Sequence, residues 1–208
     1  MDEYKIFAPL YDPLLYFVLH KIRKKVVEVA HTYNPSAIID ICCGTGNQLK
    51  YLKKSGLHHV TGVDLSPPML KQAEKGGKKV KCEEQDASEL KYSDNSFDLG
   101  IISFALHEKP LEVAGKIVKE ANRVVQPGGP LIIVDYTFNN EVKFPVKSVI
   151  RIVERLAGKY HHRYFKQYVR YGGMDYLLKG SRLAEEYRFH GGATSMRVYQ
   201  TAQYGQYA

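Results

Sequence analysis

The stretch that most constrains the fold is residues 37–49, which read A-I-I-D-I-C-C-G-T-G-N-Q-L. It opens with an almost unbroken apolar run, which is typical of a strand buried on both faces. The run ends in Gly44-Thr45-Gly46, a tight turn that lets the backbone approach a ligand closely. Asn47 then begins a predicted helix. Strand, glycine turn and helix N-terminus in this order are how doubly wound α/β proteins build a nucleotide site.

Asp40 indicates which ligand this site takes. A lone carboxylate among isoleucines is costly to bury without a partner. Dinucleotide sites use the pattern G-x-G-x-x-G, but here the third glycine position is Leu49. A carboxylate repels a pyrophosphate and attracts an ammonium group, and S-adenosylmethionine (SAM) carries an ammonium and a sulfonium but no phosphate. Asp40 therefore favours SAM over NAD.

Further acids follow the next two predicted strands. Asp64 ends the second strand and can accept hydrogen bonds from two ribose hydroxyls, a role that NAD and SAM sites share; the alternative is a cap. After the third strand, Asp86 can accept from the adenine amino group while the backbone N–H of Ala87 donates to the ring. Leu65 and Met69 are predicted to sandwich the adenine, with a core position as the alternative for Met69.

Apolar runs alternate with helical periodicity over most of the chain, which predicts a parallel sheet with right-handed crossovers. The predicted strands are 37–43, 58–65, 79–84, 97–104 and 131–136, and the predicted helices are 14–30, 47–55, 67–75 and 111–125. Beyond Asn140 we expect helices at 146–156 and 164–178, then two antiparallel strands at 182–189 and 194–201.

The composition fits one domain with an ordinary core, since 44% of the 208 residues are hydrophobic and 25% are charged. No apolar run approaches the roughly 20 residues of a membrane span, and no signal peptide is recognised. The three cysteines, Cys42, Cys43 and Cys82, are an odd number and fit neither a disulfide framework nor a zinc site. We therefore expect a cytoplasmic protein without a bound metal.

The charge is strongly positive, with a formal net charge of +8 and a pI near 9.2. This excess permits an anionic partner such as nucleic acid, a membrane surface or an acidic substrate, but a solvated lysine-rich surface gives the same totals. The basic residues are spread over several segments, so nucleic acid is disfavoured without being excluded.

Five motifs follow one another within residues 4–137: D-I-C-C-G-T-G-N, G-V-D-L-S-P-P-M-L, Q-D-A-S-E-L-K-Y-S-D-N-S-F-D, I-I-S-F-A-L-H-E and V-V-Q-P-G-G-P-L-I-I-V-D. In this order and spacing they resemble the motif series of class I SAM-dependent methyltransferases, in the style of the ubiquinone/menaquinone-biosynthesis C-methyltransferases and their type 11 relatives. The resemblance implies an α/β three-layer sandwich. Its doubly wound, mostly parallel seven-stranded sheet would have the order 3-2-1-4-5-7-6 with strand 7 antiparallel.

The same resemblance implies a set of ligand residues. It maps them onto Gly44, Thr45, Gly46, Asp64, Asp86, Ala87 and Ser103, and it implies that Tyr11, in F-A-P-L-Y-D, closes over the SAM site. Cys42 stands where the first glycine of the family motif is usual. Residues 142–180 do not match the signatures of the quinone enzymes, which leaves the acceptor open.

Methyl transfer from SAM is an in-line displacement that depends on alignment, and a base is required only when the acceptor must lose a proton. His107, just after the fourth strand, is the candidate catalytic base; the alternative is a helix-start or solvent-exposed His. Glu108 either orients His107 or caps the next helix, and we favour the cap. Four residues of the 142–180 segment are interpreted as surface residues rather than catalytic ones: His161, His162, Arg163 and Tyr164.

We therefore predict a single methyltransferase domain, residues 1–208, with an N-terminal helical lid at 1–33 and a helical insert at 142–180 over the acceptor site. The predicted function is SAM-dependent methylation of a small-molecule acceptor by a monomer or a homodimer. The alternatives are an RNA or protein methyltransferase and a SAM-binding protein without catalysis. Whether the acceptor atom is carbon, oxygen or nitrogen stays open.

Overall fold

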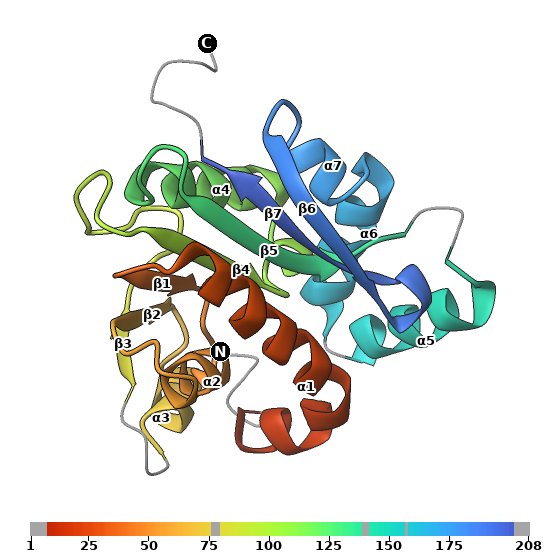
Figure 1. The fold of residues 1–208 in the computed structure, drawn as a ribbon. Helices are drawn as coiled ribbons and strands as arrows, with labels where there is room; N and C mark the ends of the chain where they lie inside the picture. Colours follow the sequence, from red (N-terminus) through yellow and green to blue (C-terminus); the bar gives the residue numbers. More distant parts are fainter. Residues whose placement is uncertain (1–7, 76–79, 139–141, 157, 202–208) are drawn as a thin grey trace.

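A seven-stranded sheet forms the centre of the computed structural model, which describes residues 8–75, 80–138, 142–156 and 158–201 (Figure 1). Its strands are β1 (Ile38–Ile41), β2 (Val60–Asp64), β3 (Lys81–Glu84), β4 (Leu99–Ser103), β5 (Pro130–Tyr136), β6 (Arg182–Phe189) and β7 (Thr194–Gln200). Their order is β3-β2-β1-β4-β5-β7-β6. The first five pair in parallel, while β7 is antiparallel to both β5 and β6. The predicted strand order and the antiparallel seventh strand are confirmed.

Helices alternate with these strands, as the periodicity predicts. They are α1 (Ala8–Tyr33), α2 (Asn47–Lys54), α3 (Pro67–Ala73), α4 (Leu111–Val124), α5 (Phe144–Leu156), α6 (Lys159–Tyr171) and α7 (Met174–Leu177), with short 3-10 turns η2 (Leu106–Glu108) and η3 (His190–Gly192). The helical stretch expected at 164–178, with a break at Gly172-Gly173, is divided at these glycines into α6 and α7, and α6 begins earlier than expected, at Lys159.

One helix boundary was predicted wrongly. We expected the first helix to begin at Leu14, after Pro13, but α1 already begins at Ala8 and contains Pro13. Proline lacks the N–H that would bond to the carbonyl four residues earlier. Here that partner lies in the first turn of the helix, so the helix loses one bond near its end and continues.

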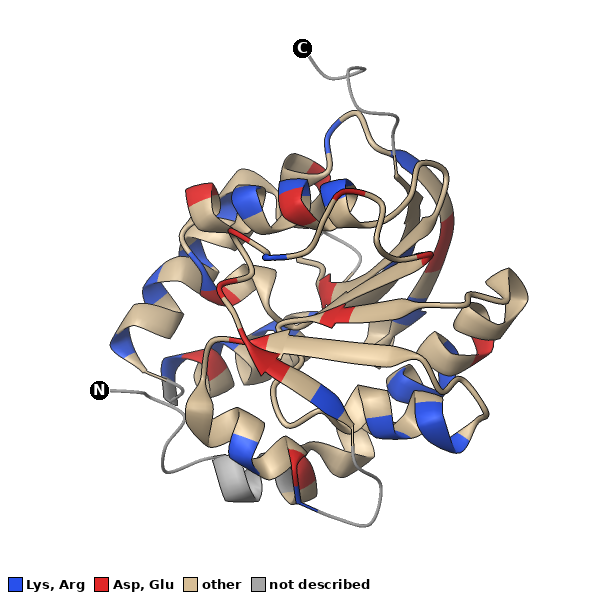
Figure 2. Cartoon of the chain, turned by 90° about the vertical axis from the view of Figure 1, so that its left-hand side faces the viewer, with Lys and Arg blue, Asp and Glu red and all other residues tan. Residues whose placement is uncertain are grey.

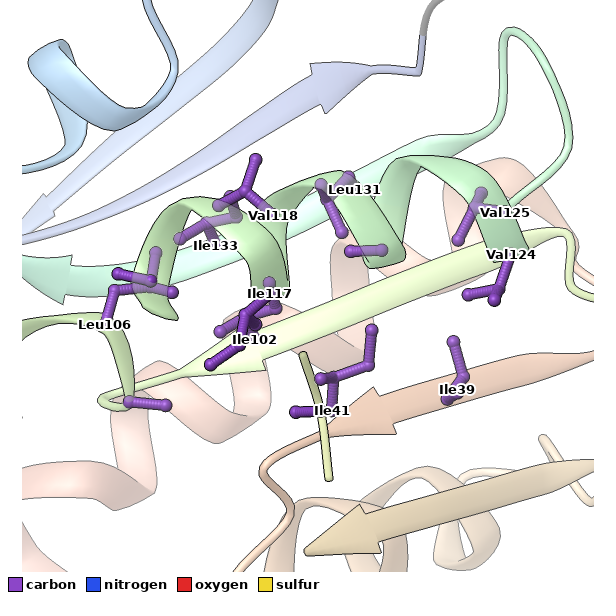
Figure 3. Packing of buried hydrophobic residues seen from close by; sticks show 14 of the residues in the cluster. Ile39, Ile41, Ile102, Leu106, Ile117, Val118, Val124, Val125, Leu131 and Ile133 are labelled. Atoms are coloured by element: carbon purple, nitrogen blue, oxygen red, sulfur yellow. The ribbon is translucent and has the colours of Figure 1, made fainter. Parts of the chain in front are cut away.

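The side chains of each central strand alternate between two layers of core. Ile39 and Ile41 belong to the cluster that includes residues of α4 on one face, and Figure 3 shows Ile117 of α4 next to Ile102 of β4 and Val118 next to Ile133 of β5. The other cluster packs α1 and α2 against the opposite face of the sheet. Alternation places Asp40 on this second face, so the carboxylate points toward α1 rather than α4.

Gly62 of β2 allows α2 to lie close to the sheet at the glycine turn. A Cβ at this position would lie 2.6 Å from Cδ1 of Leu49 and 2.7 Å from Sγ of Cys43. Contacts this short do not occur between real side chains, so a larger residue would push α2 and the turn away from β2. The glycine therefore helps to fix where the turn at Gly44 sits relative to Asp64.

Candidate functional site

The candidate site lies at the carboxyl ends of the parallel strands, where open α/β sheets bind ligands. Figure 2 shows acidic residues on the strands near their ends, while most basic residues lie on the surrounding helices. Two residues here have left-handed backbone conformations without being glycine: Cys42, with φ of 61°, and Phe104, with φ of 53°. Such strained positions cluster at functional sites.

The turn after β1 is open on one side and closed on the other. A Cβ at Gly44 would meet nothing within 4 Å, so the described residues leave room there for a ligand to approach the backbone. A Cβ at Gly46 would lie 3.0 Å from Cβ of Ala73, so this glycine allows α3 to pack against the start of α2. Thr45 between them is buried, with 3% of its surface exposed.

Asp40 is a buried carboxylate with unused bonding capacity. It is 2% exposed, and its Oδ1 has no hydrogen-bond partner among the described residues. The pKa of Asp40 is raised to about 8: burial is the largest cause, the charge of Asp64 acts in the same direction, and the charge of Arg23 opposes both. An ammonium group placed here would restore the charged form, because an opposite charge favours ionisation. The environment thus matches the cationic end of SAM.

Arg23 of α1 is a site residue that the sequence reasoning missed. It is 8% exposed, its Nη2 donates to Oδ1 of Asp12 at 3.2 Å, and its Nη1 is buried without a partner in the described structure. A signal was present in the sequence, because Arg23 lies on the buried face of α1, at helical spacing from Leu19 and Val26. A cation in an apolar stripe indicates a partner, and a ligand carboxylate would complete this one.

Asp64, at the end of β2, holds the glycine turn in place. Its Oδ2 accepts from the N–H of Gly44 at 2.8 Å, and its Oδ1 accepts from the N–H of Ser66 at 2.9 Å. Burial raises its pKa, although these two N–H donors stabilise the charged form. Each carboxylate oxygen still has a second lone pair, so the group can accept two more hydrogen bonds from neighbouring hydroxyls.

A pocket of about 530 Å³ lies next to the ends of β2 and β3. It is lined by Leu65, Glu84, Gln85, Asp86, Glu89, Leu90 and Lys91. Asp86 is exposed and accepts from the N–H and hydroxyl of Ser88, and Leu65 is 62% exposed. With three acids and one lysine in its lining, the pocket suits an uncharged heterocycle better than a phosphate.

The remaining predicted ligand residues differ from one another in how far their side chains are buried. Ala87 is 6% exposed and Met69 is 4% exposed, so both side chains are buried, and neither is among the residues that line the pocket. Ser103 is half-buried at the end of β4. Tyr11 lies in α1, but its side chain is outside the part of the chain that the structure describes.

His107 lies in η2, with its ring buried between two carboxylates. Its Nδ1 is 2.7 Å from Oδ1 of Asp135, and its Nε2 is 3.7 Å from Oε1 of Glu154. The ring is 4% exposed, and Asp135 is completely buried. Burial lowers the pKa of His107, but the charge and hydrogen bond of Asp135 and the charge of Glu154 outweigh it, and the pKa is raised. His107 is therefore not the solvent-exposed residue of the alternative interpretation.

The ion pairs continue from His107 into the insert. His161 of α6 lies 3.0 Å from Glu108 and 3.6 Å from Glu154, and Glu108 is 2.8 Å from Lys109. Burial lowers the pKa of His161, but these carboxylates raise it to about 9. The charges alternate along one series of contacts through Asp135, His107, Glu154, His161, Glu108 and Lys109.

This series corrects two interpretations. Glu108 was expected to cap the helix that follows, but its described ion pairs are with His161 and Lys109, and α4 begins after Pro110. His161 was interpreted as a surface residue, but only 13% of its side chain is exposed. In both cases the partner comes from an element distant in sequence, so local patterns gave no indication of it.

Comparisons with known proteins extend over most of the chain. A protein family described as a methyltransferase domain matches residues 39–133. The chain is 31% identical over 174 residues to a demethylmenaquinone methyltransferase of Listeria welshimeri, which covers 77% of this chain and 73% of the relative. It is 32% identical over 163 residues to a demethylmenaquinone methyltransferase of Staphylococcus haemolyticus, covering 73% of this chain and 67% of the relative.

Solved structures share the fold at low identity. An O-methyltransferase family protein from Burkholderia thailandensis has a TM-score of 0.69 and 18% identity, over 95% of this chain and 60% of that one. A 1,6-didemethyltoxoflavin-N1-methyltransferase from the same species, solved with its acceptor and S-adenosylhomocysteine, has a TM-score of 0.58 and 16% identity, over 87% of this chain and 78% of that one. These likenesses show that the sheet and its flanking helices form a known architecture.

Proposed function

The chain belongs to the class I SAM-dependent methyltransferases, in the group related to the quinone-biosynthesis enzymes, and we propose that it methylates a small aromatic acceptor. Its cofactor is SAM. The observation that supports SAM binding at this site is that two buried polar atoms, Asp40 Oδ1 and Arg23 Nη1, lack hydrogen-bond partners within the described structure. The ammonium and carboxylate of an amino-acid group match this pair in charge.

The residues of the site fit the whole cofactor. Asp40 and Arg23 would hold its amino-acid group, and Asp64 would accept from the ribose hydroxyls. We propose further contacts from Tyr11, Gly44, Thr45, Gly46, Leu65, Met69, Asp86, Ala87 and Ser103. When bound, the cofactor supplies a methyl group on a positively charged sulfur. The protein then contributes alignment and exclusion of water.

We also propose that residues 1–33 and 142–180 cover the site. Support comes from two sets of contacts: α1 brings Arg23 within electrostatic range of Asp40, and the insert brings Glu154 and His161 to the residues of η2. Because these elements carry buried charges of their own, they pack here by ionic contacts rather than by apolar burial alone. A cover held in this way would keep water out of the reaction.

A small aromatic acceptor is favoured by the rings gathered beyond β4 and β5. Phe104 lies 5.6 Å from Tyr136, and Phe138 lies 5.3 Å from Phe165, in each case between ring centroids and with steeply inclined planes. Aromatic rings give flat apolar walls that suit an aromatic ligand. The relatives named above are demethylmenaquinone methyltransferases, which supports a hydroxylated bicyclic ring as the acceptor.

The test is transfer of a labelled methyl group from SAM to a reduced, short-chain demethylmenaquinone. We expect a methylated naphthoquinol, because the reduced ring is electron-rich and can attack the methyl group. The oxidised naphthoquinone is the matched control and should not react. Label appearing in added RNA or protein, with none in the naphthoquinol, would refute the proposed acceptor class.

His107 is proposed as the base that accepts a proton from the acceptor. Asp135 fixes Nδ1, and the 3.7 Å from Nε2 to Glu154 is longer than a hydrogen bond, so Nε2 is the nitrogen that remains for proton transfer. The ring of His107 is covered by Glu154 of α5 and by the rings of Phe165 and Tyr168 of α6, so an acceptor would reach Nε2 only after a rearrangement of these helices. His107→Ala should lower turnover about 100-fold or more, with little change in SAM affinity.

The pH dependence supplies the second readout for His107. Its raised pKa means that the neutral, basic form appears only above the ordinary value of 6.5, so the wild-type rate should increase with pH through that raised value. His58→Ala, at an exposed position, is the control and should leave both rate and profile unchanged. Wild-type turnover in His107→Ala would eliminate the role as a base.

A further inference from the structure

The insert helix α5 buries an acidic residue and exposes several of its apolar residues. Among the side chains of α5 that the structure describes, Glu154 is the buried one, at 4% exposure. Val149 is 59% exposed, Ile152 58% and Val153 48%, and Phe144 at the start of the helix is 75% exposed. A helix on the surface of a soluble domain normally shows the opposite arrangement.

The three aliphatic residues form one stripe. Val149, Ile152 and Val153 are spaced i, i+3 and i+4, so they lie together on one side of α5. Successive residues of a helix are 100° apart, which places Glu154 on the opposite side. The ion pairs of Glu154 with His107 and His161 fix that side inward. The aliphatic stripe is therefore held facing away from the domain.

Basic residues accompany this stripe. Residues 142–174 contain eight Lys or Arg residues and a single acid, Glu154, which points inward. Arg155 is exposed beside Ile152. Arg151 is exposed one turn earlier, on the side nearer Glu154, with its guanidinium carbon 5.8 Å from the centroid of the Phe138 ring. The outer face of the insert thus combines apolar and cationic side chains, and the segment offers no acid to neutralise them there.

A second apolar patch lies on α1 at the same end of the molecule. Phe17 is 87% exposed, Tyr16 44% and Val18 45%. The turn η3 lies between α1 and the segment that leads into α5: Nε2 of His190 lies 3.2 Å from the carbonyl oxygen of Val18. The position of a Cβ at Gly192 is 3.9 Å from Val142, just before α5. Figure 1 shows this turn beside α5.

We propose that this face, defined by Tyr16, Phe17, Val149, Ile152 and Val153, docks on the surface of an anionic lipid bilayer. Helices that lie in the membrane interface combine apolar anchors with Lys and Arg, which anionic headgroups attract. A second copy of the chain would bring two cationic faces together. A nucleic acid would use the arginines but not the exposed aliphatic stripe. No helix in the described ranges is long and apolar enough to cross a membrane, so the protein would lie on the bilayer.

The experiment is co-sedimentation of the full chain with vesicles of phosphatidylcholine alone or mixed with phosphatidylglycerol. We expect binding to the anionic vesicles at least about tenfold tighter than to the neutral ones, and weaker at high salt. Arg151→Gln with Arg155→Gln should weaken binding about 30-fold. Val149→Ser with Ile152→Ser should weaken it about 100-fold.

Matched control variants distinguish an effect of this face on vesicle binding from an effect of net charge alone. Lys71→Gln with Lys119→Gln makes the same change in net charge at exposed positions on α3 and α4, and Leu183→Ser removes an exposed apolar residue of β6. Both should bind vesicles like the wild type. Circular dichroism and thermal unfolding confirm that each variant is folded, which is expected because the changed residues are exposed.

Several outcomes would overturn the proposal. One is that the wild-type chain does not bind vesicles at all, and another is that the control variants lose as much vesicle binding as the α5 variants. The third such outcome is that the chain does not bind vesicles and instead forms a dimer or a nucleic-acid complex that the α5 variants abolish. Methyl transfer to a water-soluble short-chain naphthoquinol does not require a membrane. Loss of the docking proposal would therefore leave the proposed reaction standing, and the reverse also holds.

Discussion

Replacing Asp64 with alanine should weaken SAM binding by about 100-fold or more. The carboxylate is the proposed acceptor for both ribose hydroxyls, and each hydrogen bond to a charged group contributes roughly 1.5–3 kcal/mol. It also accepts from the N–H groups of Gly44 and Ser66, at 2.8 and 2.9 Å, so its loss frees the glycine turn as well. Isothermal titration with SAM and with S-adenosylhomocysteine measures the effect.

Binding of a nucleoside that lacks the amino-acid group distinguishes the proposed ribose contact of Asp64 from the proposed carboxylate contact of Arg23. Asp64→Ala should weaken binding of SAM and of methylthioadenosine alike, because both carry the ribose. Arg23→Gln is the matched variant: it should weaken SAM about tenfold or more and leave methylthioadenosine unchanged, since only SAM has a carboxylate. Normal SAM affinity in Asp64→Ala would remove the ribose assignment, and equal losses for both ligands in Arg23→Gln would remove the carboxylate assignment.

Asp135→Asn should destabilise the fold by about 3–5 kcal/mol at pH 6, the usual effect of breaking a buried ion pair on one side. Asp135 is completely buried, with Oδ1 2.7 Å from the ring of His107 and Oδ2 accepting from the N–H groups of Leu106 and His107. The amide would place an N–H₂ group where donors already converge. Urea unfolding of both proteins gives the difference in the free energy of unfolding.

The same experiment at several pH values tests the ion pair itself. The pKa of His107 is raised in the folded protein, so its pairing stabilises fully below the unfolded value of 6.5 and is lost as the pH rises through the folded value. The difference between wild type and Asp135→Asn should therefore be smaller at pH 9 than at pH 6. It should not vanish, because the backbone N–H groups still lose their acceptor.

An exposed pair provides the control for Asp135. Asp94 pairs with Arg123 at 2.8 Å, but 55% of the Asp94 side chain is exposed. Asp94→Asn should cost no more than about 1 kcal/mol, because solvent screens such pairs. If Asp135→Asn had an equally small effect, the pairing of His107 would not be the contact that holds η2 against β5.

The sequence alone was enough to predict the central sheet and two acidic residues of the proposed SAM site. Near-continuous apolar runs and helical periodicity are local properties, and they predicted the strands and helices, whereas the strand order was implied by the resemblance to class I methyltransferases. Asp40 was identified because a lone acid inside a buried strand is costly unless it has a partner, and Asp64 because it ends a strand, where a carboxylate can accept from ribose hydroxyls. Their contacts with SAM stay predictions, since binding has to be measured.

Only the tertiary structure decided what surrounds these residues. The packing of α1 places Arg23 where its charge acts on Asp40, and the packing of α5 and α6 brings Glu154 and His161 to η2. The same packing buried His107 and turned the aliphatic stripe of α5 outward. Burial and charge–charge interactions depend on distances between elements far apart in the chain, and no local periodicity encodes those distances.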